Sequence, residues 1–294
     1  MYAVMGASGH IGHEISKNLL AKGEKVRVIG RSKGRLDDLI KLGAIPFEGD
    51  AHNWAFLSEC FKGCSAIFCM IPPDYQAKNM RASQNLYGEA IFKGIEASGC
   101  KKVVNLSSIG AEDDRATGPI KGLYDQEQRL NKLKGVDVIH LRPAYFLENF
   151  LSMVELIKSQ GFLGSAIKGD IPFYSVATKD IADKASKLLL EHKFSGHSHQ
   201  YVLGAKETSI NEITKEFGRA IGNKDLKYVQ FKYEDAKSAI MKMGFSEDAA
   251  NNMVELSKAA NDGSLIKFVD KGQKYFTPTT PFDFAKKYVK PLVS

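Results

Sequence analysis

The sequence contains no run of about 18 continuous apolar residues, which is the length that a membrane-spanning helix needs. Its four cysteines, Cys60, Cys64, Cys69 and Cys100, never stand in the CxxC spacing of redox or zinc motifs. We expect them to be reduced packing residues. The first apolar strand begins at Tyr2, which leaves no room for a signal peptide, so a cytoplasmic protein with no membrane partner is expected.

Long runs of one charge are also missing. The formal net charge is +7 over 294 residues, and the lysines are scattered along the chain. This scatter favours a solvated surface over a nucleic-acid-binding face, so no nucleic-acid partner is expected. An anionic ligand such as a phosphorylated cofactor agrees with the sign of the charge but is not required by it.

A metal-binding pattern is absent as well. His197 and His199 stand two apart in "SGHSHQ", and no third ligand follows at a diagnostic spacing. We expect these two histidines in a solvated loop and no bound metal. His140 alternates with apolar residues in a predicted strand, which is typical of a core histidine rather than a catalytic base.

The first half of the chain alternates short apolar runs with amphipathic stretches. This pattern predicts an α/β fold of the Rossmann type, a doubly wound parallel sheet whose strands are buried on both faces. Left-handed glycine caps are expected where helices end at Gly23, Gly43 and Gly99. The predicted strands are 2–6, 25–30, 44–50, 65–71, 101–108 and 136–143.

After Pro143 the regular alternation stops, and the pattern becomes mostly helical. We therefore predict a nucleotide-binding domain over residues 1–150 and a smaller, helix-rich lobe over residues 151–294. The strand and helix signals near 171–203 are expected to return to the first domain. The lobe should cap the carboxyl ends of the strands and carry the substrate or partner specificity.

The stretch "MGASGHIGHEI" follows the first strand and leads directly into a helix. Gly6 permits a tight turn, Gly9 lets backbone N–H groups approach a diphosphate, and Gly12 lets helix and strand pack closely. The helix N-terminus then offers unpaired N–H donors to phosphates. A tight turn that binds nothing is the alternative, but the strand–turn–helix context favours a dinucleotide site.

The end of the second strand distinguishes the two nicotinamide cofactors. An acid there would hold the ribose hydroxyls of NAD, whereas "GRSKGRLDD" places Arg31, Ser32 and Lys33 there with no acid before Asp37. A guanidinium can pair with a 2′-phosphate, so NADP(H) is favoured over NAD(H). Arg31 as a plain solvated loop residue is the alternative interpretation.

A third segment, "EGDAHNWAFL", follows the third strand. Asp50 is placed to accept a hydrogen bond from the exocyclic amine of an adenine. Alternatively, Asp50 and Asn53 cap the helix that follows.

With "GASGHIG", "VIGRSKGRL", "EGD", "NLSSIGA" and "LRPAYFLENF" in this order, the chain resembles the NmrA-like, atypical short-chain dehydrogenases/reductases over nearly its whole length. The resemblance implies an NAD(P)-binding protein, and the family includes quinone reductases, reductases of phenolic compounds and non-catalytic redox sensors. The cofactor contacts that it implies are Gly6, Ser8, Gly9, His10, Ile11, Gly12, Arg31, Ile71, Pro72, Ser107 and Ser108, with Tyr145 and Phe146 bordering the nicotinamide.

The catalytic pair of typical relatives, Tyr-x-x-x-Lys, is missing. Tyr124 is the candidate tyrosine, but Gln128 stands where the lysine would lower its pKa. Lys121, one helical turn before Tyr124, is the only candidate substitute that lies close enough. Tyr124 as an ordinary residue of an amphipathic helix remains the alternative.

Without a placed proton donor, a quinone-like acceptor is favoured over a simple ketone, because its reduction yields a weakly basic phenolate. The residues expected to line the pocket for such a flat acceptor are Tyr124, Tyr145, Phe146, Asn149 and Phe150. The apolar members of this set are equally compatible with a core between the lobes.

Three functions therefore follow from the sequence. The first is an NADPH-dependent reductase of quinone-like or other conjugated carbonyl acceptors. The second is a non-catalytic NADP(H) sensor that binds a protein partner, and the weakest is a nucleotide-sugar epimerase. A homodimer is compatible with any of the three.

Overall fold

The computed structural model describes residues 1–267, 269 and 272–293. In this part of the chain, eight parallel strands form one sheet in the order β13-β10-β6-β5-β4-β1-β2-β3. The order reverses direction between β1 and β4, as in a doubly wound fold. The strands are β1 (Tyr2–Met5), β2 (Val26–Gly30), β3 (Ile45–Glu48), β4 (Ala66–Cys69), β5 (Lys102–Leu106), β6 (Asp137–Pro143), β10 (His197–Leu203) and β13 (Lys274–Phe276).

The central strands are apolar throughout because each face of the sheet carries its own core. In β1, Val4 points into the cluster on one face, while Ala3 and Met5 point into the cluster on the other. In β4, Phe68 and Ile67 divide in the same way. Successive side chains of a strand point to opposite faces, so a strand buried on both sides reads as a continuous apolar run.

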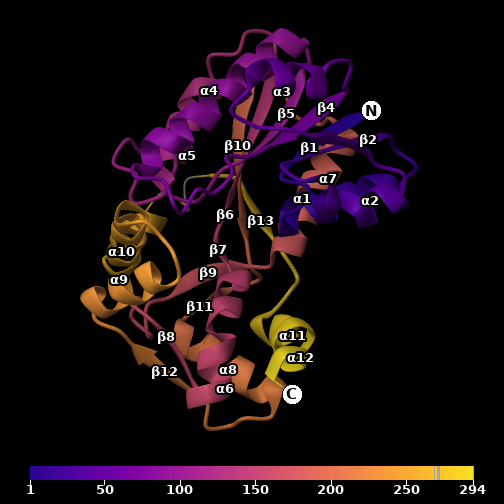
Figure 1. The fold of residues 1–294 in the computed structure, drawn as a ribbon. Helices are drawn as coiled ribbons and strands as arrows, with labels where there is room; N and C mark the ends of the chain where they lie inside the picture. The colour runs from indigo at the N-terminus through magenta and orange to yellow at the C-terminus, as the bar shows by residue number, and fades with distance from the viewer. Residues whose placement is uncertain (268, 270–271, 294) are drawn as a thin grey trace.

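Helices cover both faces of the sheet (Figure 1). The helices α1 (His10–Leu20), α2 (Asp37–Lys41) and α7 (Thr178–Glu191) contribute to one cluster, with the 3-10 turn η1 (Lys33–Leu36) leading into α2. The helices on the other face are α3 (Trp54–Phe61), α4 (Met80–Ser98) and α5 (Ile120–Leu130). The predicted Rossmann-type fold is therefore confirmed.

The predicted glycine caps are also present. Gly23, Gly43 and Gly99 have φ angles of 78°, 96° and 72°, and Gly99 ends α4 in the left-handed conformation. A residue with a Cβ would be strained there, which explains why glycine stands between each helix and the next strand.

The second half of the chain forms a lobe below the carboxyl ends of the large sheet (Figure 1). It has its own core, in which Phe150, Phe217 and Phe284 are almost fully buried. Its elements are β7 (Tyr145–Phe146), η2 (Leu147–Met153), α6 (Val154–Gln160), β8 (Phe162–Ser165), β9 (Phe173–Val176), β11 (Glu207–Thr208), α8 (Ile210–Ile221), β12 (Lys227–Gln230), α9 (Tyr233–Lys242), α10 (Glu247–Asn261), η3 (Ser264–Ile266), α11 (Pro281–Phe284), the π-helical turn η5 (Ala285–Val289) and α12 (Lys290–Val293).

The boundary between the first domain and the lobe does not fall at a single position near residue 150, because later elements return to the first domain. The helix α7 packs beside α1, and β10 extends the large sheet by pairing with β6. The sequence pattern assigned the whole region 171–203 to the first domain. In the structure, however, β9 belongs to a small sheet with β7 and β11. The edge strand β13, which the sequence pattern did not indicate, returns to the large sheet from the C-terminal part.

Two sequence expectations about single residues have different outcomes. The four cysteines are free and buried, as expected, and burial raises the pKa of each thiol. The placement of His197 and His199 in a loop is wrong, because both lie on β10 and pair with β6. Their loop-like polarity arises because the first part of β10 is solvent-exposed.

His140 is a core residue of β6 with only 2% of its surface exposed. The Asn105 side chain lies 3.1 Å from its Nδ1, and the Asn131 side chain lies 3.0 Å from its Nε2. Burial away from water lowers its pKa from 6.5 to about 4, so the imidazole is neutral at physiological pH.

This lowered pKa predicts an acid-dependent loss of stability. A group with a folded pKa below its unfolded value stabilises the fold above the unfolded pKa and loses that contribution as the pH falls towards 4. Between pH 7 and pH 4.5, the free energy of unfolding should fall by about 2–3 kcal/mol less in His140→Gln than in wild type. Urea titrations at both pH values measure this, with exposed His197→Gln as the control. Equal losses in wild type and His140→Gln would contradict the assignment.

Candidate active site

The glycine turn lies at the carboxyl end of β1 and positions α1. Gly6 has a φ of 65°, which favours glycine. A Cβ on Gly12 would lie 2.4 Å from the Gly6 carbonyl oxygen and 2.8 Å from that of Met5. No side chain fits at such distances, so Gly12 is required for α1 to approach β1 this closely.

The N-terminus of α1 is left open by this arrangement. Its N-cap is Gly9, which offers no side-chain cap, and the first helical turn contains no acid. The first intrahelical bond is donated by the His13 N–H to the Gly9 oxygen (2.9 Å). The N–H groups of His10, Ile11 and Gly12 are the donors that a helix leaves unsatisfied, and they attract a negative charge. The turn therefore has the geometry of a phosphate site.

The turn also lies at the point where an open α/β sheet binds its ligands, because the strand order reverses between the neighbouring strands β1 and β4. A cavity of about 280 Å³ opens beside it, between the first domain and the lobe. Residues Ser8, Gly9, His10, His13 and Glu14 line one wall, and Glu148, Leu151, Thr178, Lys179 and Tyr288 line the rest.

Glu148 is a member of this cavity that sequence reasoning missed. Its carboxylate accepts hydrogen bonds from the Thr178 N–H (3.0 Å) and the Thr178 hydroxyl (2.6 Å), which ties η2 to the start of α7. Burial raises the pKa of Glu148, and the Thr178 bonds oppose that rise. The only signal in the sequence was an acid within the apolar stretch "FLENFL".

Arg31, Ser32 and Lys33 are exposed at the carboxyl end of β2. Among the described residues, Arg31 makes no ion pair or side-chain hydrogen bond, so its guanidinium is available to a ligand. Burial raises the pKa of the Tyr87 phenol. The charge of Arg31 opposes this rise and the charge of Asp50 adds to it, so both charges lie close to that ring.

Asp50 is engaged within its own loop. It accepts hydrogen bonds from the backbone N–H (2.9 Å) and Nδ1 (3.0 Å) of His52, and the His52 ring stacks on Tyr87 with centroids 3.7 Å apart. Asn53 caps α3 by accepting from Ala55 and Phe56, so the helix-capping alternative holds for Asn53 and not for Asp50.

Four further residues of the predicted cofactor site follow β4 and β5. Ile71 is buried and Pro72 partly buried after β4, and the Ser108 hydroxyl donates to the Ile109 carbonyl. The Ser107 hydroxyl is also buried and donates to Glu127 Oε1 (2.5 Å). The hydrogen of Ser107 is therefore committed inward, which leaves its oxygen as an acceptor only.

Ser107 belongs to a buried ionic cluster that the sequence did not reveal. Arg142 Nε donates to Glu127 Oε1 (3.0 Å) and Arg142 Nη2 to Glu127 Oε2 (2.6 Å), while Glu112 lies 3.8 Å from the guanidinium. Burial raises the pKa of Glu112, and Arg142 opposes that rise. Such a pair is costly to break from one side, about 3–5 kcal/mol, so it holds α5 rigidly against β6.

The catalytic roles assigned to Tyr124 and Lys121 find no support in the structure. Lys121 Nζ forms an ion pair with Glu255 of α10 (2.7 Å), which directs its charge towards the lobe. Tyr124 packs in a small apolar cluster with Ala116 and Ile120. The alternative interpretation, an amphipathic-helix tyrosine, describes it better, and Gln128 is exposed.

Of the five residues expected to line one substrate pocket, the structure brings Tyr145, Asn149 and Phe150 together and places Tyr124 and Phe146 elsewhere. Tyr145 and Phe150 pack in the core of the lobe with ring centroids 5.6 Å apart, and burial raises the pKa of Tyr145 to about 12. Phe146 packs against the core of the first domain, while Asn149 is exposed. The short strand β7 and the 3-10 turn η2 point successive side chains in different directions. These side chains therefore pack on both sides of the junction of the lobes and stabilise it.

The described residues contain no group of three or more His, Cys, Asp or Glu side chains that could hold a metal ion. None of the helices in the described ranges is long and apolar enough to cross a membrane.

A model of the NmrA-like family matches residues 2–275. The chain belongs to the NmrA-like family. The resemblance expected from the sequence motifs is thereby confirmed. The chain is also similar to an NAD(P)H azoreductase from Xenophilus azovorans, with 26% identity over 293 residues and 98% of both chains covered.

Two solved structures share the fold of this NmrA-like protein. A triphenylmethane reductase from Citrobacter sp. aligns with a TM-score of 0.80 at 18% identity, covering 99% of both chains. An NADPH-dependent quinone oxidoreductase from Escherichia coli, in complex with NADPH, aligns with a TM-score of 0.79 at 19% identity, covering 97% of this chain and 98% of that one.

The contact at Gly12 predicts a binding defect that is separable from stability. We expect Gly12→Ala to destabilise the protein by about 1–3 kcal/mol, because the turn must shift away from the added methyl group. Affinity for a nicotinamide dinucleotide should fall at least about tenfold with it. Thermal unfolding and titration calorimetry measure the two effects.

Gly23→Ala is the matched control for this substitution. It lies at the other end of α1, where no atom is within 4 Å but φ is 78°. It should cost about 1 kcal/mol and leave affinity unchanged. If Gly12→Ala binds as tightly as wild type, the turn does not contact the dinucleotide.

Proposed function

We propose that the protein is an NADPH-dependent oxidoreductase that directs hydride transfer to a quinone-like or other conjugated acceptor. The observation that carries the proposal is the open, uncapped N-terminus of α1 behind the Gly6–Gly12 turn, located where the strand order reverses between β1 and β4. The names of the relatives, an NAD(P)H azoreductase and an NADPH-dependent quinone oxidoreductase, support the same class of reaction.

The residues present fit a phosphorylated dinucleotide. The N–H groups at the start of α1 would hold its diphosphate, and the unpaired guanidinium of Arg31 would hold the 2′-phosphate. The ends of β4 and β5, with Pro72, Ser107 and Ser108, would border the nicotinamide. When bound, NADPH supplies the hydride. The protein positions the acceptor and excludes water.

The side chains of α5 restrict the class of suitable acceptors, because they give little help with proton transfer. Lys121 is paired to Glu255 and Gln128 carries no charge, so neither can assist Tyr124 in giving a proton to a strongly basic alkoxide. A quinone yields a phenolate with a conjugate acid of pKa about 10, which water can protonate. This argument favours quinone-like acceptors over simple ketones.

The same absence motivates a second candidate. A protein that binds NADP(H) without a placed proton donor is also suited to sensing redox state through a protein partner. The two functions differ in whether the cofactor is consumed.

The reductase function predicts oxidation of NADPH by a panel of benzoquinones and naphthoquinones, with NADPH preferred to NADH. The absorbance of the reduced nicotinamide in the presence of purified protein measures it. Tight NADPH binding with no oxidation across the panel would favour the sensor. Absence of binding would refute the dinucleotide site itself.

The assignment of Arg31 predicts a loss that depends on the 2′-phosphate. Arg31→Glu should weaken NADPH binding about tenfold to a hundredfold, because a charge-assisted bond worth about 1.5–3 kcal/mol becomes a repulsion. NADH binding should change by less than about threefold. Lys22→Glu, at the far end of α1, introduces the same charge change as a control. Equal losses for both cofactors would contradict the assignment.

A further inference from the structure

The carboxylate of Glu148 lies in the same cavity as the glycine turn. This cavity of about 280 Å³ has Ser8, Gly9 and His10 on one wall and Glu148 of η2 on another. The proposed dinucleotide site places a doubly charged diphosphate at the first wall, against the N–H groups of α1. Glu148 therefore brings a further negative charge to the space that the diphosphate would enter.

Glu148 is held in place by neutral donors. The Thr178 N–H donates to its carboxylate over 3.0 Å and the Thr178 hydroxyl over 2.6 Å. Thr178 is the first residue of α7, and the N-cap residue Ala177 offers no side-chain cap, so the carboxylate of Glu148 takes that place. Among the described residues, Glu148 makes no ion pair. Its charge is thus fixed in position without being neutralised.

The other titratable side chains that line this cavity are His10, His13 and Glu14 from α1, Lys179 from α7 and Tyr288 from η5. Three of these have partners of opposite charge, which are Asp38 for His13, Lys17 for Glu14 and Asp183 for Lys179. Burial raises the pKa of Glu148, and the charge of His10 opposes that rise, so these two side chains lie close together. His10 begins α1, which places Glu148 near the start of that helix.

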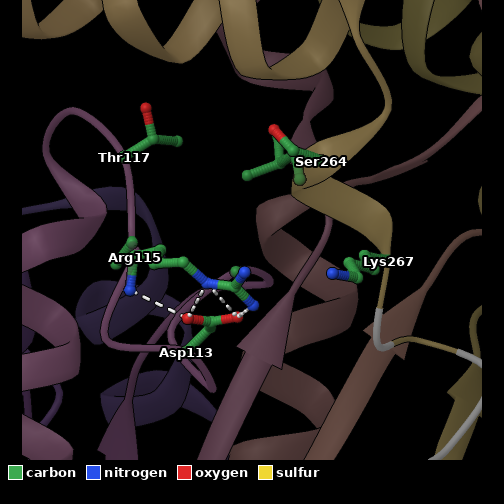
Figure 2. A pocket seen from close by; sticks show the side chains of 8 residues that line it. Asp113, Arg115, Thr117, Ser264 and Lys267 are labelled. Atoms are coloured by element: carbon green, nitrogen blue, oxygen red, sulfur yellow. Dashed lines mark hydrogen bonds and ion pairs between the residues drawn. The ribbon is translucent and has the colours of Figure 1, made fainter.

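A second cavity, of about 150 Å³, shows the commoner arrangement of charge. Figure 2 shows that its acid, Asp113, lies against the guanidinium of Arg115, whose Nε donates to the carboxylate over 2.9 and 3.1 Å. The acid of that cavity is compensated by a cation, whereas the carboxylate of Glu148 has only a hydroxyl and an amide as donors. A half-buried carboxylate without a counter-ion is costly, and such groups are concentrated at functional sites.

We infer that Glu148 limits the affinity of the dinucleotide site: its carboxylate opposes the diphosphate while it is ionised, and it takes up a proton from the solvent when the dinucleotide binds. The inference rests on the proposed function and adds how binding at that site is regulated. A nearby like charge favours the protonated form of a carboxyl group. The diphosphate stays ionised near neutral pH, so the proton goes to Glu148. The dinucleotide is therefore held less tightly as the pH rises.

The substitution Glu148→Gln tests this directly, because it removes the charge and keeps an oxygen that can accept from Thr178. At pH 8, the affinity for NADP+ measured by calorimetry should rise about threefold to tenfold, since one repulsion in a partly desolvated site is lost. As the pH falls towards 5, the affinity of wild type should approach that of the variant, because a protonated carboxyl no longer repels phosphate. Titration of the 2′-phosphate is common to both proteins and cancels in the ratio of their dissociation constants.

A second measurement counts the protons. Calorimetry in buffers of different ionisation enthalpy gives the number of protons taken up for each NADP+ bound. Wild type should take up more than Glu148→Gln, by a fraction of one proton, in the pH range over which the two affinities converge. Equal uptake at every pH would overturn the inference.

Two controls separate the charge of Glu148 from its structural role. Glu155→Gln makes the same change of charge at an exposed position of α6 that does not line the cavity, and it should bind NADP+ as wild type does. Thr178→Val removes the hydroxyl bond to Glu148 but leaves the charge, so binding should not tighten. If Thr178→Val binds as tightly as Glu148→Gln, the effect belongs to the lost bond and the inference is wrong.

These assays need no turnover, so they distinguish this inference from the reductase function. Tighter binding by Glu148→Gln supports the inference even if no acceptor is reduced. Binding by wild type that Glu148→Gln leaves unchanged at pH 8 refutes the inference alone. No binding by wild type refutes the dinucleotide site, and the inference with it.

Discussion

The structure depends on the close approach of α1 to the end of β1. A single added carbon at Gly12 would overlap the carbonyl oxygens of Gly6 and Met5. Because this position carries no side chain, the helix can start directly behind the strand, with its N-terminus open at the carboxyl edge of the sheet. The uncapped helix N-terminus, the cavity beside it and the approach of the lobe through Glu148 all follow from that placement.

The chemistry expected of this protein is set by a replacement on α5. Typical relatives direct a tyrosine and a lysine from this helix towards the cofactor. Here Gln128 stands in place of that lysine, and Glu127, one of the buried residues of α5, is bound by Arg142 and Ser107. A charge that is fully paired inside the protein stabilises the packing of α5 on β6 but has no proton to give. Acceptors that tolerate weak proton donors are consistent with such a site.

Positive charge occurs on both sides of the switch point, in different surroundings. Arg31 is exposed at the end of β2, and within the described residues it makes no ion pair or side-chain hydrogen bond. Arg115, in the loop that follows β5, is held by the carboxylate of Asp113.

Much of the fold could be read from the sequence, because its signals are local. Continuous apolar runs such as 66–69 predict strands buried on both faces, and Gly99 predicts a helix end, since each depends only on near neighbours. The glycine turn is of the same kind. The short edge strand β13 was missed because three exposed or half-buried residues carry no apolar period of their own.

The sequence by itself determined the parallel sheet, the glycine turn and the family, since these depend on periodicity and on spacing along the chain. Only the tertiary structure decided that Lys121 turns to Glu255, that Phe150 packs in the core of the lobe, and that Arg142 binds Glu127 in a buried pair. The physical reason is sequence separation: the partners of the first pair stand 134 positions apart, and no local propensity encodes such a contact.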